Sequence, residues 1–567
     1  MSRAFTNRIS EVTKALNSLD HERLEHPVSP AYPTIAPQSP HCPTCHCHSG
    51  SSILIDGRFE CFLTKKEPYR WNGKEYTKGS RRAYIFCTMD WTFNWCDVAR
   101  ATIDMLPDVA LLEIFDSYVI ALGYKKQAWH TLVHVCQKWR FVAFGSPRRL
   151  DLRLACEART PVRETLDVWP LLPIVIYAHT LSTSTSVGNI VAGLEHNDRV
   201  CEMYITGVSR SRMENVWAAL QQPFPALTRL EFLSQFLYEA APVVPASFLD
   251  GSVPALQILW LDGTPFPGIP NFLLSATHLV YLSLTNIPHS GYFSPEAMVT
   301  ALSVLARLEC LEIAFDSPRS RPDQNSRRLP PQTRTLLPVL TELTFNGAAE
   351  YLEVLVAQLD APLLDRLKID FFHELIFDTL RLTQFISRTP NFRARDEARL
   401  KFRECDVAVK LPRTFYGSIR LRISCSESDL QLSSVAQVCS SSFPSTLILA
   451  VERLYIQSMH WEQPWEDDIE VSQWLELFRP FVAVKDLYFS SDFTPQIATA
   501  LQELGESGAE VLPALEMLFF EEPLPSGPVQ EALEQFVAAR QLAGHPIAIS
   551  PWEREEEGCD TDYESCE

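Results

Sequence analysis

A short apolar pattern, Leu-x-x-Leu-x-Leu with conservative replacements, recurs along this chain and limits the folds open to it. Clear copies begin mostly 23 to 33 residues apart, and helix-like stretches such as 295–305 and 350–359 lie between them. A short strand followed by a helix, repeated at such a period, stacks into a solenoid whose strands form one parallel sheet. We therefore predict an α/β fold, with an irregular solenoid shaped like a horseshoe over residues 148–550. Ten copies are clear: Val200-Met203-Ile205, Leu227-Leu230-Phe232, Leu256-Leu259-Leu261, Leu279-Leu282-Leu284, Leu308-Leu311-Ile313, Leu340-Leu343-Phe345, Leu364-Leu367-Ile369, Val451-Leu454-Ile456, Val484-Leu487-Phe489 and Leu515-Leu518-Phe520.

Two weaker copies, Leu400-x-Phe402 and Ile419-x-Leu421-x-Ile423, lie between the seventh and eighth clear ones. The alternative is a generic leucine-rich α/β fold, which the similar spacing of ten copies disfavours. Asparagine rarely follows the strand, and Asn286 and Asn346 come closest to that position. The turns between strands and helices are therefore expected to be irregular.

Each copy also predicts one outward-facing residue. The second and third apolar residues point into the core, so the residue between them points to the opposite face, because strand side chains alternate. Large aromatic residues in such a row are costly to expose and often supply the binding energy of protein interfaces. We predict that Trp260, Glu312, Lys368, Tyr455 and Tyr488 bind a protein target. The full row reads Glu231, Trp260, Ser283, Glu312, Thr344, Lys368, Tyr455, Tyr488 and Phe519.

A different outcome is possible at the end of the row. There the terminal repeats would bend and bury Tyr488 and Phe519 against the C-terminal helix.

Two segments before the repeats have helical spacing. In the first, Pro107 suits the first position of a helix and Asp108 faces the positive end of its dipole. Leu111, Leu112, Phe115 and Val119 then form one apolar stripe. In the second segment the apolar stripe consists of Trp129, Leu132, Val133, Cys136 and Trp139. Such short helices cannot bury all these side chains among themselves, so they predict a partner surface or, alternatively, a helical hairpin packed on the next domain.

The two segments resemble an F-box. F-boxes typically open with Leu-Pro, continue with a Leu-Leu-x-Ile-Phe core and close with Val-Cys-x-x-Trp-Arg. Here these elements are Leu106-Pro107, Leu111–Phe115 and Val135–Arg140, with Val109-Ala110 departing from the usual acidic and larger aliphatic residues. The following stretch 144–170 is similar to a large fungal group of F-box proteins, of basidiomycete type, in which the box runs directly into leucine-rich repeats.

The resemblance implies a function without catalysis. It implies a substrate-recognition subunit of an SCF-type ubiquitin ligase, in which the box docks on a Skp-type adaptor and cullin while the repeats hold a target protein near the ubiquitin-loading machinery. The alternative is a leucine-rich-repeat scaffold without a ligase, whose degenerate box caps the repeats. The implied adaptor-binding residues are Leu106, Pro107, Leu111, Leu112, Ile114, Phe115, Leu132, Val135, Cys136 and Trp139.

Composition and charge limit the cellular compartments and the kinds of partner that we expect. The net charge of −20 argues against nucleic acid as the main partner, because phosphate binding needs a basic face. No apolar run approaches 18 residues and no signal-peptide core follows Met1, which predicts neither a membrane span nor secretion. Fifteen cysteines spread over the whole length are typical of reduced thiols. We expect an intracellular protein, cytoplasmic or nuclear or both.

The chain ends and one loop carry weaker signals. Residues 1–100 are predicted to be a largely disordered extension, residues 104–147 the helical module and residues 551–567 an acidic disordered tail. Cys42, Cys45 and Cys47 have a spacing found in zinc sites, but no second ligand pair follows at a defined distance. We therefore predict no metal and no cofactor. The arginine-rich insertion 318–334 fits a solvated loop better than a site for an acidic partner.

No motif of a known catalytic class is present. The phosphate-binding, dinucleotide-binding, zinc-protease and serine-hydrolase patterns are all missing from the sequence. We predict that the chain is not an enzyme. A hydrolase hidden in the irregular region 375–450 is the weakest of the alternatives.

Overall fold

The computed structural model describes most of the chain from Leu106 to Glu553. The gaps are 122–127, 147–152, 159–160, 169–170, 172, 180–183, 234–241, 323–332, 373–378, 394, 413–416, 426–427, 460–469, 508–510 and 522–526. Four short strands are described before Leu106: β1 (Ser51–Ile55), β2 (Arg58–Phe62), β3 (Tyr69–Trp71) and β4 (Lys74–Tyr76). Cys42, Cys45 and Cys47 lie outside the described residues, as do the middle of the arginine-rich insertion and residues 554–567.

The chain divides into two compact units, Met1–Leu152 and Arg153–Glu567. The first contains three described helices, α2 (Asp108–Ala121), α3 (Ala128–Val135) and α4 (Gln137–Gly145). The second segment of helical spacing is thus two helices, because Cys136 breaks it in an extended conformation. The Cys136 Sγ accepts a hydrogen bond from the Trp139 backbone N–H at 3.4 Å and so acts as the N-cap of α4.

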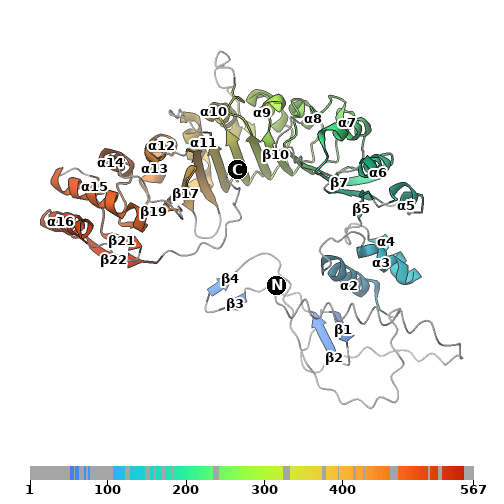
Figure 1. The fold of residues 1–567 in the computed structure, drawn as a ribbon, viewed down its shortest axis with the longest axis horizontal. Helices are drawn as coiled ribbons and strands as arrows, with labels where there is room; N and C mark the ends of the chain where they lie inside the picture. The colour runs from blue at the N-terminus through green and yellow to red at the C-terminus, as the bar shows by residue number, and fades with distance from the viewer. Residues whose placement is uncertain are drawn as a thin grey trace. The chain divides into compact units, whose positions relative to one another are not determined.

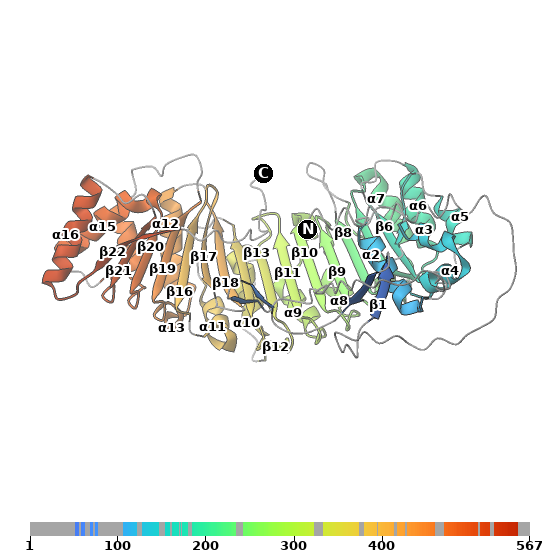
Figure 2. The same cartoon turned by 90° about the horizontal axis from the view of Figure 1, so that it is seen from below.

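The second unit is a mixed α/β structure built on one large sheet of sixteen strands (Figure 1). The strands are β5 (Arg153–Ala155), β6 (Ile174–Ala178), β7 (Val200–Thr206), β8 (Arg229–Leu233), β9 (Ile258–Asp262), β10 (Tyr281–Ile287), β11 (Cys310–Phe315), β13 (Glu342–Gly347), β15 (Arg366–Phe371), β16 (Glu397–Phe402), β17 (Asp406–Pro412), β18 (Ser418–Ser424), β19 (Arg453–Ser458), β20 (Asp486–Phe489), β21 (Met517–Glu521) and β22 (Ala548–Trp552). A separate pair, β12 (Thr335–Leu336) and β14 (Leu359–Asp360), runs parallel. Figure 2 shows the strands of the large sheet side by side along the unit.

Helices cover one face of this sheet (Figure 1). The α-helices are α5 (Val162–Val168), α6 (Ser184–Leu194), α7 (Arg210–Ala219), α8 (Ile269–Leu273), α9 (Pro295–Leu302), α10 (Ala349–Ala357), α11 (Leu380–Arg388), α12 (Ser428–Ser441), α13 (Ser445–Ile448), α14 (Val471–Phe478), α15 (Thr494–Ser507) and α16 (Pro528–Leu542). Short 3₁₀ turns are η2 (Phe248–Gly251), η3 (His289–Gly291), η5 (Pro390–Phe392) and η6 (Ser491–Phe493). We call the opposite face of the sheet, which these helices leave uncovered, the open face.

The repeats form because each strand alternates and each helix begins at a defined residue. In β13, Leu343 and Phe345 are buried toward the helices, while Glu342 and Thr344 lie on the open face. Before α9, the Ser294 hydroxyl accepts a hydrogen bond from the Ala297 N–H at 3.3 Å, and Pro295 occupies the first turn. The predicted helices 295–305 and 350–359 are confirmed as α9 and α10: α9 begins at Pro295 as predicted and ends three residues earlier, and α10 begins one residue earlier and ends two residues earlier.

The sheet is parallel except at one place. Strands β16, β17 and β18 form an antiparallel meander, in which β18 pairs with β15 and β16 pairs with β19. The chain therefore passes from β15 through α11 to β16, three places further along the sheet, and returns through β17 to β18. The two weaker copies of the pattern are the outer strands of this meander, and the region 375–450 contributes strands to the same sheet.

Gly417 immediately precedes the last strand of the meander, β18. Its φ is +86°, a left-handed conformation that favours glycine, and a Cβ there would collide with Asp365. The glycine lets β18 approach β15 closely enough to pair with it.

The described residues differ from three of the sequence predictions. Strand β22 extends to Trp552, so two residues assigned to the acidic tail belong to the sheet. Asn286 lies inside β10, at the register shift between Leu284 and Ile287, with a φ of 50°; its side chain donates to Asp262 in the preceding repeat at 2.7 Å and so orders this irregular end of the strand. Six described cysteines are free thiols, but Cys405 is in a disulfide, so the prediction of reduced thiols throughout is wrong at that residue.

Candidate functional site

The helical module has its own small core. Phe115 of α2 packs on Trp139 of α4 with ring centroids 4.8 Å apart, and both side chains are buried. Leu111 and Leu132 are buried as well. The Lys138 ammonium donates to the Leu106 carbonyl at 2.7 Å and so fixes α4 to the start of α2.

The predicted adaptor-binding residues fall into three groups in this module. Leu111, Phe115, Leu132 and Trp139 are buried, and Leu106, Leu112, Ile114 and Cys136 are half-buried. Pro107 and Val135 are exposed. The buried members hold the helices together, so only the other six present surface to a partner.

Two large apolar side chains missing from that list are strongly exposed. Val109 is 60% exposed and Phe141 is 76% exposed. Val109 belongs to the dipeptide that departs from the F-box pattern, and Phe141 follows its last residue. The F-box pattern therefore predicted neither residue as part of the surface. The helical spacing between Trp139 and Phe141 nevertheless places the two side chains on different sides of α4.

On the large sheet, the predicted row of outward-facing residues is a continuous line. Strand register pairs Glu231 with Trp260, Trp260 with Ser283, Ser283 with Glu312, Glu312 with Thr344 and Thr344 with Lys368. It also pairs Tyr455 with Tyr488 and Tyr488 with Phe519. The meander inserts Arg420, Lys410 and Arg399 between Lys368 and Tyr455, which the repeat pattern did not predict.

The C-terminal end of this row is a stack of aromatic rings, which we call the aromatic ladder: Tyr455, Tyr488, Phe519 and Trp552. Tyr455 and Tyr488 stack with centroids 4.2 Å apart, and Tyr488 and Phe519 also stack at 4.2 Å. Trp552 lies against Tyr455 at 5.9 Å and Tyr488 at 5.6 Å. The rings are half-buried by one another on the open face, so they form a continuous aromatic surface.

The N-terminal part of the row contains two glutamates, Glu231 and Glu312. Glu231 is buried and paired with Arg229 at 2.7 Å, and the Ser283 hydroxyl donates to Glu312 at 2.6 Å. Trp260 is half-buried between them, and its indole N–H is buried without a hydrogen-bond partner. The part of the Trp260 ring that stays exposed on the open face favours it as a contact residue, because tryptophan is enriched among the residues that dominate protein interfaces.

Two carboxyl groups near the open face have raised pKa values. Burial raises the pKa of Asp262, although hydrogen bonds from Thr285 and Asn286 act in the other direction. Burial also raises the pKa of Asp406, against the opposing effect of Arg403 and Arg422. Both carboxyls lie beside groups that hold neighbouring strands together, so we regard them as structural.

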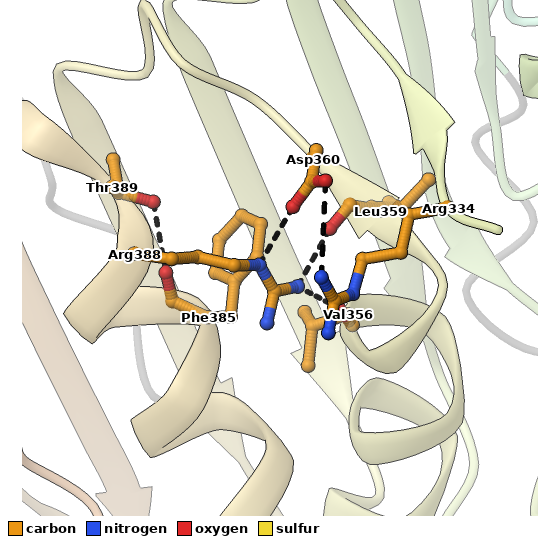
Figure 3. A network of polar contacts seen from close by, with 7 residues as sticks. All are labelled: Arg334, Val356, Leu359, Asp360, Phe385, Arg388 and Thr389. Carbon is orange, nitrogen blue, oxygen red and sulfur yellow. Dashed lines mark hydrogen bonds and ion pairs between the residues drawn. The ribbon is translucent and has the colours of Figure 1, made fainter. Parts of the chain in front are cut away.

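The helix side of the repeats carries a polar network with the same structural character (Figure 3). Arg388, at the end of α11, binds Asp360 at 2.7 Å and donates to the Val356 and Leu359 carbonyls at 2.6 Å each. The Val356 carbonyl lies in the last turn of α10, where helix carbonyls lack partners further along the helix, and Leu359 begins β14. Arg388 therefore ties one repeat to the next, and Arg334 lies 4.0 Å from the other oxygen of Asp360.

Within the described part of the chain, no group of three or more His, Cys, Asp or Glu side chains is arranged to hold a metal ion. Among the same residues, no helix is both long and apolar enough to cross a membrane. No protein-family model matches the chain, and no curated protein matches it. Two surfaces of the described residues are the candidates for binding: the exposed side chains of the helical module and the open face of the sheet.

Proposed function

We propose that the protein is the non-catalytic substrate-recognition subunit of an SCF-type, cullin-RING ubiquitin ligase. Its F-box-like module, residues 106–146, binds a Skp-type adaptor, which joins it to the cullin. Its leucine-rich-repeat-like solenoid, 153–552, binds a target protein, and partner subunits transfer the ubiquitin. Such a complex acts inside the cell, in the cytoplasm, the nucleus or both.

One observation carries the adaptor part of this proposal. The helical module completes its core with Leu111, Phe115, Leu132 and Trp139, yet it leaves Val109 and Phe141 strongly exposed. A folded module gains nothing in water from exposing a phenylalanine, so these side chains support a docking partner. The half-buried Leu112 and Ile114, on the same helix as Val109, would extend the contact.

The open face supports the target-binding part. Trp260, Glu312, Lys368, Tyr455 and Tyr488 occupy one line across the sheet, on the side without helices. A row that combines a half-buried tryptophan, stacked tyrosines and charges of both signs includes residue types that dominate protein interfaces.

The second candidate is a repeat scaffold without a ligase. It is favoured by the burial of Phe115 and Trp139, because the most characteristic residues of the motif serve the module's own core. In that case the module caps the repeats or binds another protein.

A binding measurement with the adaptor distinguishes the ligase subunit from the scaffold without a ligase. The full chain is mixed with a purified Skp-type adaptor and cullin, and binding is measured by titration. We expect Val109→Glu with Phe141→Glu to weaken adaptor binding by at least about thirtyfold, the effect of losing about 2 kcal/mol at an interface centre.

The matched control is Leu542→Glu, which places the same charge on an apolar side chain that is 90% exposed at the end of α16. It should leave binding unchanged. If the native chain does not bind the adaptor, or the double variant binds as well as the control, the ligase assignment is wrong.

A further inference from the structure

A second aromatic surface lies on the open face, and Trp260 of β9 is its centre. Strand β9 is eight places from β19, the first strand of the aromatic ladder, in the sheet order. Alternation along β9 places Ile258, Trp260 and Asp262 on the same face. Tyr281 of β10 lies directly across from Ile258, and all four side chains are half-buried. The surface thus combines a large ring, apolar neighbours and one carboxyl group.

The chain places its own arginines over two other rings of this face. The Arg229 guanidinium lies over the Tyr204 ring, 5.1 Å from its centroid, and the Arg399 guanidinium lies over the Tyr455 ring at 5.2 Å. The negative face of an aromatic ring attracts a cation at this range, and tryptophan attracts it more strongly than tyrosine. In the part of the chain that the structure describes, no cation lies over the Trp260 ring.

Asp262 supplies a carboxylate beside this ring. It is two residues from Trp260 on the same face, which is about 6.7 Å along the strand. The Thr285 hydroxyl and the Asn286 amide both donate to its Oδ1, at 2.8 Å and 2.7 Å. Both donors are neutral, and Oδ2 accepts no hydrogen bond from the described residues. The structural role of Asp262 therefore uses one oxygen and leaves the other for a partner.

The charge around the ring is negative. The open-face positions of β7, β8 and β9 hold three carboxylates, Glu202, Glu231 and Asp262, and one basic side chain, Arg229. Arg229 binds Glu231 at 2.7 Å and lies directly across from Glu202 in the strand register. Burial raises the pKa of Asp262, and the groups that oppose this effect are neutral donors. These strands therefore provide no cation for Asp262.

A side chain that suits both groups is cationic and planar. An arginine guanidinium stacks on an aromatic face and donates its N–H groups to a carboxylate oxygen. Its methylene stem packs along apolar surface, which Ile258 and Tyr281 provide beside the ring. The ammonium of lysine is compact and does not stack in this way. Charge complementarity therefore favours a protein segment that carries an arginine.

We propose that Trp260 and Asp262 form the recognition site for an arginine side chain of the target protein. The guanidinium lies over the Trp260 ring and donates to Asp262 Oδ2, in the place that the chain's own arginines fill over the two tyrosines. This inference rests on the target-binding part of the proposed function and names the chemistry that the target must carry.

The test measures whether peptide binding depends on one arginine. The probe is a library of random peptides displayed on phage and selected on the full chain at about 0.15 M salt, which screens long-range attraction to an acidic protein. Selected peptides are synthesised with a fluorescent label, and a matched set replaces arginine by glutamine. We expect arginine to be enriched among the selected peptides, and its replacement to weaken binding about tenfold in fluorescence anisotropy.

Two variants locate the contact. Asp262→Asn keeps the Oδ1 acceptor but removes the charge, and Trp260→Leu keeps an apolar side chain but removes the ring. In each variant the loss on replacing arginine should fall to about threefold or less. The matched control is Asp486→Asn, which removes a half-buried carboxylate from the same face at β20 and should keep the tenfold loss. Circular dichroism confirms that each variant is folded.

Three results would overturn the proposal. The first is a tenfold loss that persists in either Asp262→Asn or Trp260→Leu. The second is a set of selected peptides in which arginine is not enriched, and the third is a folded chain that binds no peptide from the library. Peptide binding is measured without adaptor or cullin, so this inference and the ligase proposal fail separately.

Discussion

At the scale of single residues, side-chain alternation decides which groups can serve a partner and which hold the repeats together. On the open face, Tyr488 and Lys368 remain half-buried at the surface, whereas Leu487 and Leu367, one position earlier, are fully buried. On the helix side, the polar contacts cap helix ends. Arg388 is the clearest case, since one guanidinium serves Asp360 and two carbonyls of the preceding repeat.

The first prediction concerns this arginine. Arg388→Ala should lower the free energy of unfolding of the repeat unit by about 1.5–3 kcal/mol, the usual range for hydrogen bonds to a charged group. Urea unfolding followed by circular dichroism measures the change. Arg381→Ala on the same helix is the control, because its guanidinium donates to the exposed Gln384 at 3.3 Å. Equal losses in the two variants would contradict the structural role of the network.

At the scale of secondary-structure elements, the sequence predicted local periodicity well and connectivity poorly. The ten clear copies all correspond to strands, since Leu-x-x-Leu-x-Leu specifies both the strand and its buried face. The break at Cys136 was not predicted, because an apolar stripe continues across it and a cysteine is rarely recognised as an N-cap. The meander was not predicted either. Its strands alternate like the others, and strand direction depends on pairing partners distant in the sequence.

The candidate site, too, could be predicted from the sequence only in part. The line from Glu231 to Lys368 followed from alternation alone, because those strands are sequential neighbours. The continuation through Arg420, Lys410 and Arg399 did not, since it needs β16, β17 and β18 to lie in reverse order between β15 and β19. The pattern also does not predict how exposed each side chain is. For this reason Phe115 and Trp139 were predicted to bind the adaptor, whereas Phe141 was not.

The second prediction distinguishes a core role for Phe115 from a surface role for Phe141. Phe115→Ala should destabilise the helical module by about 3–5 kcal/mol, because it removes a buried ring that packs on Trp139. We expect limited proteolysis of the full chain to cleave within 106–146 in this variant while the repeat unit stays protected. Phe141→Ala should change stability by no more than about 0.5 kcal/mol, as at most exposed positions. A Phe115→Ala chain that keeps the module protected would show that the ring serves a partner instead of the core.

At the scale of the whole molecule, the repeat unit depends on contacts between neighbours in the sheet. Strand β10 pairs with β9 on one side and β11 on the other, and α9 packs on α8 and α10. Each repeat thus buries its apolar residues against two others, and no repeat has a complete core alone. The two candidate surfaces are divided in the same way: the helical module belongs to a separate compact unit, whereas the open face exists only when the repeats are stacked.

The last prediction tests this dependence. Deleting 279–307 removes β10, η3 and α9. The deletion runs from Leu279, the first residue of one copy, to the residue before Leu308, the first residue of the next copy. The repeat register is therefore kept. The apolar surfaces of β9 and β11, shaped to fit β10, then meet each other. We expect the melting temperature of the repeat unit to fall by at least about 5 °C, since 1 kcal/mol corresponds to about 2–4 °C in a domain of 150–250 residues. Deleting 554–567, which removes charged chain beyond the sheet, should change it by no more than about 3 °C. Circular dichroism melts of the two deletions compare them directly, and equal melting temperatures would contradict a stacked array.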